Sequence, residues 1–254
     1  MPYAEAGGIS LHYQEAGQGG VPALMLHELG GSGESWATAL PLFARTRRAL
    51  AVDLRSAGRS EKPPCAFTLM DCADDLARFL DAMDLAQVDV IGSALGSLVG
   101  AVLAGRHPSR VRRLMMCAVS DDLGGVTADY LTARADRVRT EGMRAVVDSS
   151  LKNAFPDAFA AQRSAYRAIY LANHPAAYAE LSLALTRLRV DWGAIVAPTL
   201  VASGAHDFIW PPEHGRHVAT LVPGARFALL PDAGHFPHLQ TPDALVALAT
   251  DFLG

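Results

Sequence analysis

The sequence predicts an α/β fold in which a mostly parallel sheet is flanked by helices and interrupted by a helical insertion. Short buried strands alternate with helical segments through the first 120 residues, and this alternation resumes after residue 192. Such alternation favours a parallel sheet with helices on both faces. Residues 121–192 are rich in Ala, Leu and Arg at helical periodicity, with no convincing strand. The chain has 254 residues, half of them apolar, which is enough for one large core.

The first 120 residues supply most of the predicted sheet. Gly7-Gly8 separates two short segments that predict an opening β-hairpin. A helix is expected over about 68–82, because apolar side chains recur at helical spacing and Thr68 with Asp71 resembles a capping box. A second helix, rich in small apolar residues, is expected over 98–104. Buried strands are expected at 23–26, 49–52, 88–91 and 114–118.

The pattern after residue 192 completes the sheet. Strands are expected at 199–202 and 227–230, and Thr241-Pro242-Asp243 marks the start of a closing helix with proline in its first turn. We therefore expect one domain with an insertion: a core of residues 1–120 and 193–254, and a helical cap of residues 121–192. The cap should cover the carboxyl edge of the sheet, where pockets form in open α/β folds.

Composition narrows the possible partners. The net charge is −4, from 22 basic and 26 acidic side chains, which favours neither nucleic acid nor an anionic membrane surface. No apolar run is long enough for a transmembrane helix, and the first residues do not resemble a signal peptide. The three cysteines fit neither a disulfide framework nor a zinc site. We expect a cytoplasmic protein that acts on a small molecule without a metal or cofactor; the oligomeric state stays open.

A tight turn between a strand and a helix carries the first functional signal. Gly92-Ser93-Ala94-Leu95-Gly96 matches G-x-S-x-G, the turn that lifts a nucleophilic serine above a sheet, except that the central residue is alanine. Ala94 has no nucleophilic atom and cannot form an acyl-enzyme. Ser93 should point away from the pocket, and Ser97 lies in the first helical turn, so both are expected to be structural.

An acid and a base follow the last two strands. Asp207 comes just beyond the strand at 199–202, and His235 lies in the loop after the strand at 227–230. An aspartate in such a place can hold an imidazole in one tautomer and stabilise its protonated form. His235 and His238 form H-x-x-H, but no third ligand is evident, so we do not expect a metal site.

The glycine-rich loop at residues 27–31 is the candidate partner of the turn in binding an oxyanion. The backbone N–H groups of Leu29 and Leu95 are the expected donors, and backbone donors survive a change of nucleophile. A phosphate cradle is disfavoured because no Lys-[Ser/Thr] follows the glycines. Trp36 and Trp210 are expected to flank the pocket, as substrate contacts or as packing residues.

Together these residues resemble the α/β-hydrolase superfamily over essentially the whole chain, including the order nucleophile position, acid, base. The segment 53–60 is similar to the family's D-x-R-G-x-G-x-S turn, with Ser56 in place of glycine, and Gln240 replaces glutamate in a G-H-x-P-x-x-E-x-P-like stretch. Within the superfamily, the chain resembles 3-oxoadipate enol-lactonase over 90–115. It also resembles the aminoacrylate hydrolases in its Leu-Gly-Gly-Ser-Gly loop and in Ala94-Leu95-Gly96; that resemblance implies alanine at this position.

Three functions are compatible with this pattern. In the first, the protein is a serine hydrolase of a small ester or lactone, and Ala94 is an inactivating Ser→Ala replacement. In the second, Ala94 is natural, and His235 with Asp207 activates water on an activated substrate such as an enamine or a lactone. In the third, the protein binds a ligand without catalysis. Residues 121–192 contain nine basic and nine acidic side chains, which neither demand nor exclude an anionic substrate.

Overall fold

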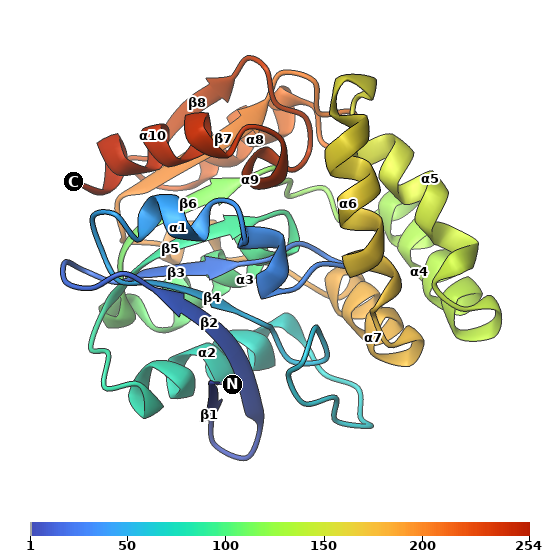
Figure 1. The fold of residues 1–254 in the computed structure, drawn as a ribbon, viewed down its shortest axis with the longest axis horizontal. Helices are drawn as coiled ribbons and strands as arrows, with labels where there is room; N and C mark the ends of the chain where they lie inside the picture. The colour runs from blue at the N-terminus through green and yellow to red at the C-terminus, as the bar shows by residue number, and fades with distance from the viewer. Residues whose placement is uncertain (1) are drawn as a thin grey trace.

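The computed structural model describes residues 2–254, and within them one sheet organises the molecule (Figure 1). Its strand order is β1-β2-β4-β3-β5-β6-β7-β8. The first two strands pair antiparallel, β2 joins β4 antiparallel, and all later pairs are parallel. The predicted hairpin and the mostly parallel sheet are thus confirmed. The strands are β1 (Tyr3–Glu5), β2 (Ser10–Ala16), β3 (Ala23–Leu26), β4 (Ala49–Val52), β5 (Val88–Ser93), β6 (Val111–Cys117), β7 (Thr199–Gly204) and β8 (Arg226–Leu230).

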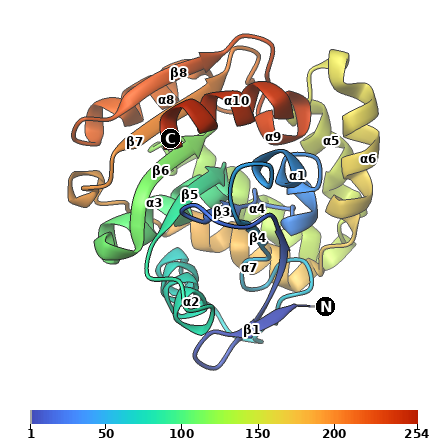
Figure 2. The same cartoon turned by 60° about the vertical axis from the view of Figure 1, so that its left-hand side comes forward.

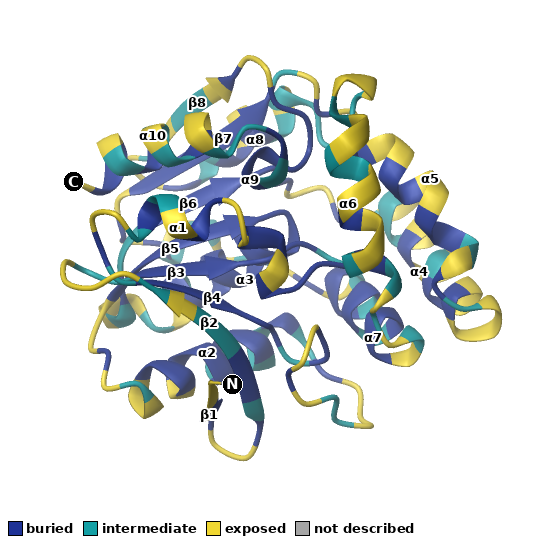
Figure 3. Cartoon of the chain, viewed as in Figure 1, coloured by how far each residue is buried: buried dark blue, intermediate teal, exposed yellow. Residues whose placement is uncertain are grey.

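Helices cover both faces of the sheet, as Figure 2 shows from a second direction. On one face, α2 (Leu69–Ala82), α3 (Leu95–Arg106) and α8 (Pro212–Leu221) pack on one alternate set of strand residues. On the other face, α1 (Leu40–Phe43) and α10 (Pro242–Leu253) pack on the opposite set. Because both faces are covered, the central strands are buried along their whole length (Figure 3).

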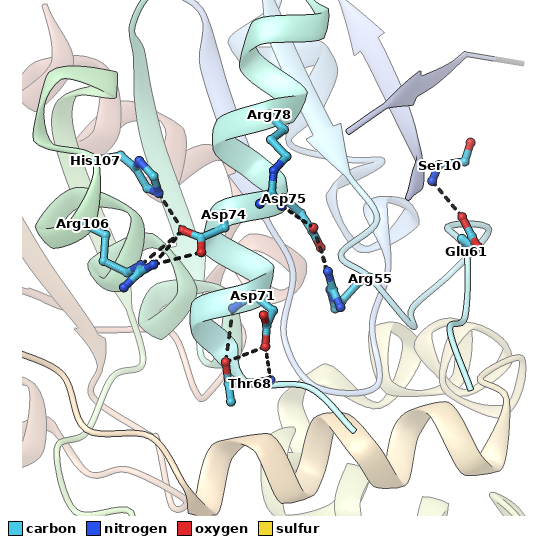
Figure 4. A network of polar contacts seen from close by, with 10 residues as sticks. All are labelled: Ser10, Arg55, Glu61, Thr68, Asp71, Asp74, Asp75, Arg78, Arg106 and His107. Atoms are coloured by element: carbon cyan, nitrogen blue, oxygen red, sulfur yellow. Dashed lines mark hydrogen bonds and ion pairs between the residues drawn. The ribbon is translucent and has the colours of Figure 1, made fainter. Parts of the chain in front are cut away.

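Helix α2 begins as the sequence predicts and is tied to its neighbour α3 (Figure 4). The Thr68 hydroxyl accepts from the backbone N–H of Asp71, whose carboxylate in turn accepts from the N–H of Thr68. Further along α2, Asp74 accepts hydrogen bonds from Arg106 and from His107 at the end of α3. These contacts hold α2 against α3, the helix that follows the turn at residues 92–96.

Residues 121–192, all of which the structure describes, contain helices and no strand. These helices, which we call the cap helices, lie at the carboxyl ends of the strands (Figure 1). That they form a cap distinct from the core stays a prediction. They are α4 (Gly125–Glu141), α5 (Arg144–Ala154), α6 (Ala160–Leu171) and α7 (Pro175–Thr186).

Several elements differ from the expectation in extent. Helix α3 begins at Leu95, three residues before the predicted 98, because the turn passes directly into the helix. The sequence pattern did not predict α1, α8 or the short α9 (Pro237–Gln240).

Among residues 2–254, no helix combines the length and apolar character needed to cross a bilayer. Short 3₁₀ turns are η1 (Gly33–Trp36), η2 (Pro108–Arg110), η3 (Asp157–Phe159) and η4 (Trp192–Ala194).

Candidate active site

The turn between β5 and α3 holds Ala94 in a conformation that L-residues rarely adopt, with φ 48° and ψ −109°. Its N–H donates to the carbonyl of Cys117 at 2.9 Å. Both glycines of the turn are sterically required. A Cβ on Gly92 would lie 2.4 Å from the nitrogen of Ser97, and one on Gly96 would lie 2.1 Å from the carbonyl oxygen of Leu26. Strain of this kind costs about 1–3 kcal/mol and persists where the surroundings enforce it.

The neighbouring serines are placed away from the cavity, and neither can replace the missing nucleophile from where it lies. The Ser97 hydroxyl donates to the carbonyl of Cys117 at 2.8 Å. Ser93 is fully buried in β5, and neither serine lines the cavity beside Ala94. Their structural assignment therefore agrees with the geometry.

Asp207 and His235 meet as the sequence suggests. The Nδ1 of His235 lies 2.8 Å from Oδ2 of Asp207, and both side chains are almost completely buried. The other carboxylate oxygen accepts from the backbone N–H groups of Ile209 and Trp210, at 2.9 Å each. Because a carboxylate only accepts, Nδ1 must carry the proton, which leaves Nε2 as the basic nitrogen. No described residue is hydrogen-bonded to Nε2, and His235 lines the cavity.

The residues that carry the expected oxyanion donors line the same cavity. Leu29 and Leu95 both line it, next to Ala94. Among the described residues, neither backbone N–H donates a hydrogen bond to another group of the protein. Two unengaged N–H groups beside the turn can therefore serve an incoming oxygen.

The cavity has a volume of about 260 Å³ and lies between the turn and the cap helices. Trp210 lines it and packs edge-on against His235, with ring centroids 5.4 Å apart. Of the two roles expected for Trp36, the structure agrees with packing and not with a place in the cavity wall. Trp36 is fully buried away from the cavity wall and packs on His238, with centroids 4.5 Å apart. Its place in η1, on the face covered by α1 and α10, turns its ring into the core.

Glu28 is a cavity residue that the sequence reading did not select. Its carboxylate accepts from Ser35 Oγ at 2.7 Å and lies 3.0 Å from Nε2 of His238. Burial by itself would raise the pKa of Glu28, but the charge and hydrogen bond of His238 and the charge of His27 lower that pKa to about 2. Glu28 is therefore ionised at neutral pH, and each of its carboxylate oxygens has a hydrogen-bond partner. The sequence contains a feature that could have identified Glu28: it is a carboxylate within the glycine-rich loop that follows a buried strand.

His238 and His235 have different carboxylate partners and do not converge. Among residues 2–254, no group of three or more His, Cys, Asp or Glu side chains is arranged to hold a metal ion. The groups available for chemistry at this site are therefore the oriented imidazole of His235 and the backbone N–H groups of Leu29 and Leu95, beside the strained turn at Ala94.

Comparison with known proteins places this geometry in a family. The family model for the alpha/beta hydrolase fold matches residues 22–192. The chain is 31% identical to a Variovorax paradoxus protein provisionally named carbamate hydrolase RutD, over 89% of each chain. It is 28% identical, over 94% of its length, to the dihydrolipoyllysine-residue acetyltransferase component of the acetoin cleaving system of Pseudomonas putida, and it spans 65% of that protein.

Among solved structures, the enol-lactonase from Burkholderia xenovorans LB400 superposes with a TM-score of 0.93 at 29% identity, over 99% of both chains. The match extends through the core and the cap helices alike. The resemblance expected from the turn, the acid and the base is therefore confirmed at the level of the superfamily. The chain belongs to the α/β-hydrolase family.

Proposed function

We propose that the protein hydrolyses a small ester or lactone, with His235 as general base and Asp207 as its orienting acid. The observation that carries the proposal is that His235, the strained turn at Ala94, and Leu29 and Leu95 all line one cavity. The enol-lactonase similarity supports a lactone among the possible substrates. We also propose that the cap helices form the roof of this cavity.

In the chain as it stands, the route is attack by water. The substrate carbonyl oxygen accepts from the N–H groups of Leu29 and Leu95, and Nε2 of His235 removes a proton from water as the water oxygen bonds to the acyl carbon. Asp207 stabilises the imidazolium that forms. The tetrahedral intermediate then collapses, the bond to the leaving oxygen breaks, and His235 returns the proton to that oxygen.

The backbone conformation at position 94 is the one that the G-x-S-x-G turn gives to a nucleophilic residue. A serine at position 94 would project its hydroxyl into the cavity beside His235, and the same dyad would then run a covalent route through an acyl-enzyme. The two routes share every residue except the nucleophile. Residue 94 therefore decides between them, and the Ala94→Ser variant separates them.

The first experiment removes the base. His235→Ala should abolish hydrolysis of short esters and lactones by the protein, because water then has no general base. His206→Ala is the matched control, since His206 is an exposed histidine near the acid. Unchanged turnover in the His235 variant would exclude the mechanism.

The second experiment restores the hydroxyl. Ala94→Ser should raise kcat/KM by about a hundredfold or more, because nucleophilic catalysis is added to a complete dyad and oxyanion site. Mass spectrometry of the variant during turnover should detect the acyl-enzyme. If neither form turns over any ester or lactone while ligands raise the melting temperature of both, the protein is a binding module and the proposal fails.

A further inference from the structure

Arg134 brings a positive charge to the cavity that contains Ala94 and His235. The residue extends from α4, and its guanidinium is surrounded by hydroxyl groups from all four cap helices. Nε donates to Tyr178 Oη at 2.6 Å and Nη1 donates to Tyr130 Oη at 2.7 Å. The Nη2 group donates to both Ser150 Oγ and Tyr170 Oη.

The charge of Arg134 has no counterion in the described part of the chain. Its four partners are neutral, and no carboxylate of residues 2–254 forms an ion pair with it. Its helix neighbours differ: Arg137 pairs with Glu141, and Arg139 pairs with Glu180. Hydroxyl groups solvate a guanidinium but do not neutralise it, and an unpaired charge out of bulk water is unfavourable. A ligand carboxylate would remove that deficit.

Donors remain free on one edge of the cluster. A guanidinium has five N–H groups, and the hydrogen bonds to the four hydroxyls leave one N–H on Nη1 without an acceptor in the described residues. Tyr130 Oη accepts from the same Nη1, so its own proton is available to a second acceptor. Two adjacent donors beside a fixed positive charge suit the two oxygens of a carboxylate.

Glu28, the other charged side chain of the cavity wall, is not available to pair with Arg134 or with a ligand. Among the lining residues, the Asp, Glu, Lys and Arg side chains are Glu28 and Arg134 alone. Glu28 is already paired with His238 and hydrogen-bonded to Ser35. Most of the other residues that line the cavity are apolar or aromatic, including Leu131, Leu151 and Phe236. A ligand that contacts both the turn and Arg134 would therefore meet mostly apolar groups over the rest of its surface.

We propose that Arg134 and Tyr130 form the binding site for a carboxylate of the substrate, which is therefore an ester or lactone with a second, free carboxylate remote from the bond that is cleaved. This inference rests on the proposed function for the reacting end of the substrate, and on the cap helices for the other end. It places recognition on α4 and chemistry on the loops of the sheet.

Binding to the full chain tests the proposal without any turnover. The ligands are glutaric acid monoamide and glutardiamide, which differ only by a carboxylate in place of a carboxamide. Isothermal titration calorimetry at pH 7 should show that the monoamide binds about tenfold more tightly, as expected for a charge-assisted pair. Arg134→Gln should abolish that preference and leave the affinity for the diamide unchanged.

Three further variants make the test specific. Arg137→Gln, an exposed cation of the same helix, should leave the preference intact. Arg134→Lys keeps the charge and should retain part of the preference. Tyr130→Phe removes the hydroxyl of a half-exposed residue at little risk to folding and should reduce the preference about threefold.

The outcomes separate this inference from the proposed function. Equal affinity of the unmodified protein for the two ligands, or no binding of either, overturns the carboxylate site, and so does a preference that survives in Arg134→Gln. None of these results bears on the His235→Ala and Ala94→Ser assays. Conversely, a protein that never hydrolyses a substrate but shows the predicted preference would keep the carboxylate site and lose only the hydrolase proposal.

Discussion

At the scale of single residues, Ala94 shows that backbone geometry and side-chain chemistry are separable. Its φ of 48° is held by a hydrogen bond to Cys117 and by the close approach of Gly92 and Gly96 to neighbouring backbone. None of these constraints involves the side chain at position 94. The turn therefore keeps its shape with alanine in it, and the proposed oxyanion donors beside it keep their positions.

Glu28 gives a residue-scale prediction for the pH dependence of stability. The pKa of Glu28 in the folded protein is about 2, below the ordinary value of 4.5, so the ionised form is favoured by folding. Its contribution is complete above pH 4.5 and is lost as the pH falls from 4.5 towards 2. Glu28→Gln should lower the free energy of unfolding at pH 7 by about 3 kcal/mol and flatten the acid dependence in that window.

Urea denaturation at pH 7, 4.5 and 3 measures this effect. The control is Glu213→Gln, since Glu213 is exposed on α8 and should change stability little at any of these values. A Glu28→Gln protein as stable as the unmodified one at pH 7, with the same loss on acidification, would contradict the assignment.

At the scale of elements, the strand–helix approach is the feature on which the site depends. Helix α3 packs so closely on β3 that a Cβ at Gly96 would lie 2.1 Å from the carbonyl oxygen of Leu26. Gly96→Ala should therefore displace α3 and lower the free energy of unfolding by about 2 kcal/mol or more. It should also reduce turnover, because the N–H of Leu95 moves with the helix.

Gly105 provides the matched control on the same helix. A Cβ at Gly105 would meet its nearest neighbour at 3.7 Å, an ordinary contact, and the residue has no left-handed conformation. Gly105→Ala should stabilise α3 by up to about 1 kcal/mol, because alanine has the higher helix propensity. Chemical denaturation of both variants decides the matter; equal effects of the two substitutions would show that close packing at Gly96 is unimportant.

At the scale of the whole molecule, a buried charge cluster joins distant parts of the chain. Asp89 in β5 is fully buried and accepts from Arg47 Nη1 at 2.9 Å and from Arg112 Nε at 2.7 Å. The same arginines donate to the carbonyls of Gly254 and Leu253 at the end of α10. The cluster thus connects the segment before β4, two central strands and the last helix.

Removing the central carboxylate should leave both arginines without their counterion. Asp89→Asn is expected to lower the free energy of unfolding by about 3 kcal/mol, because one partner of a buried ion pair is lost. Asp81→Asn is the comparison: its side chain is 67% exposed in its pair with Arg110, and the cost should stay below about 1 kcal/mol. Thermal and urea unfolding measure the loss of stability in both variants. Similar losses would contradict the role of the Asp89 cluster in holding these elements together.

The sequence predicted the sheet, both of its flanking layers and the place of the dyad for a common reason. Strand and helix periodicities are local, and in a parallel sheet the carboxyl ends of the strands meet at one edge. Asp207 and His235 each follow a strand, so their meeting follows from topology. The short α1 and α8 were missed because the packing that stabilises them against the sheet cannot be read from local pattern alone.

What only the tertiary structure decided concerns side chains whose partners come from several elements. Nothing in the local sequence distinguishes Trp36 from Trp210. Trp210 nevertheless lines the cavity and Trp36 lies in the core, because packing decides which part of the fold each ring reaches. Arg134 was one of nine basic residues in a neutral segment. Its hydroxyl cluster exists only because four helices converge, and no local pattern encodes that convergence. The sequence by itself determined the family and the dyad; the fold decided where an anionic substrate could be held.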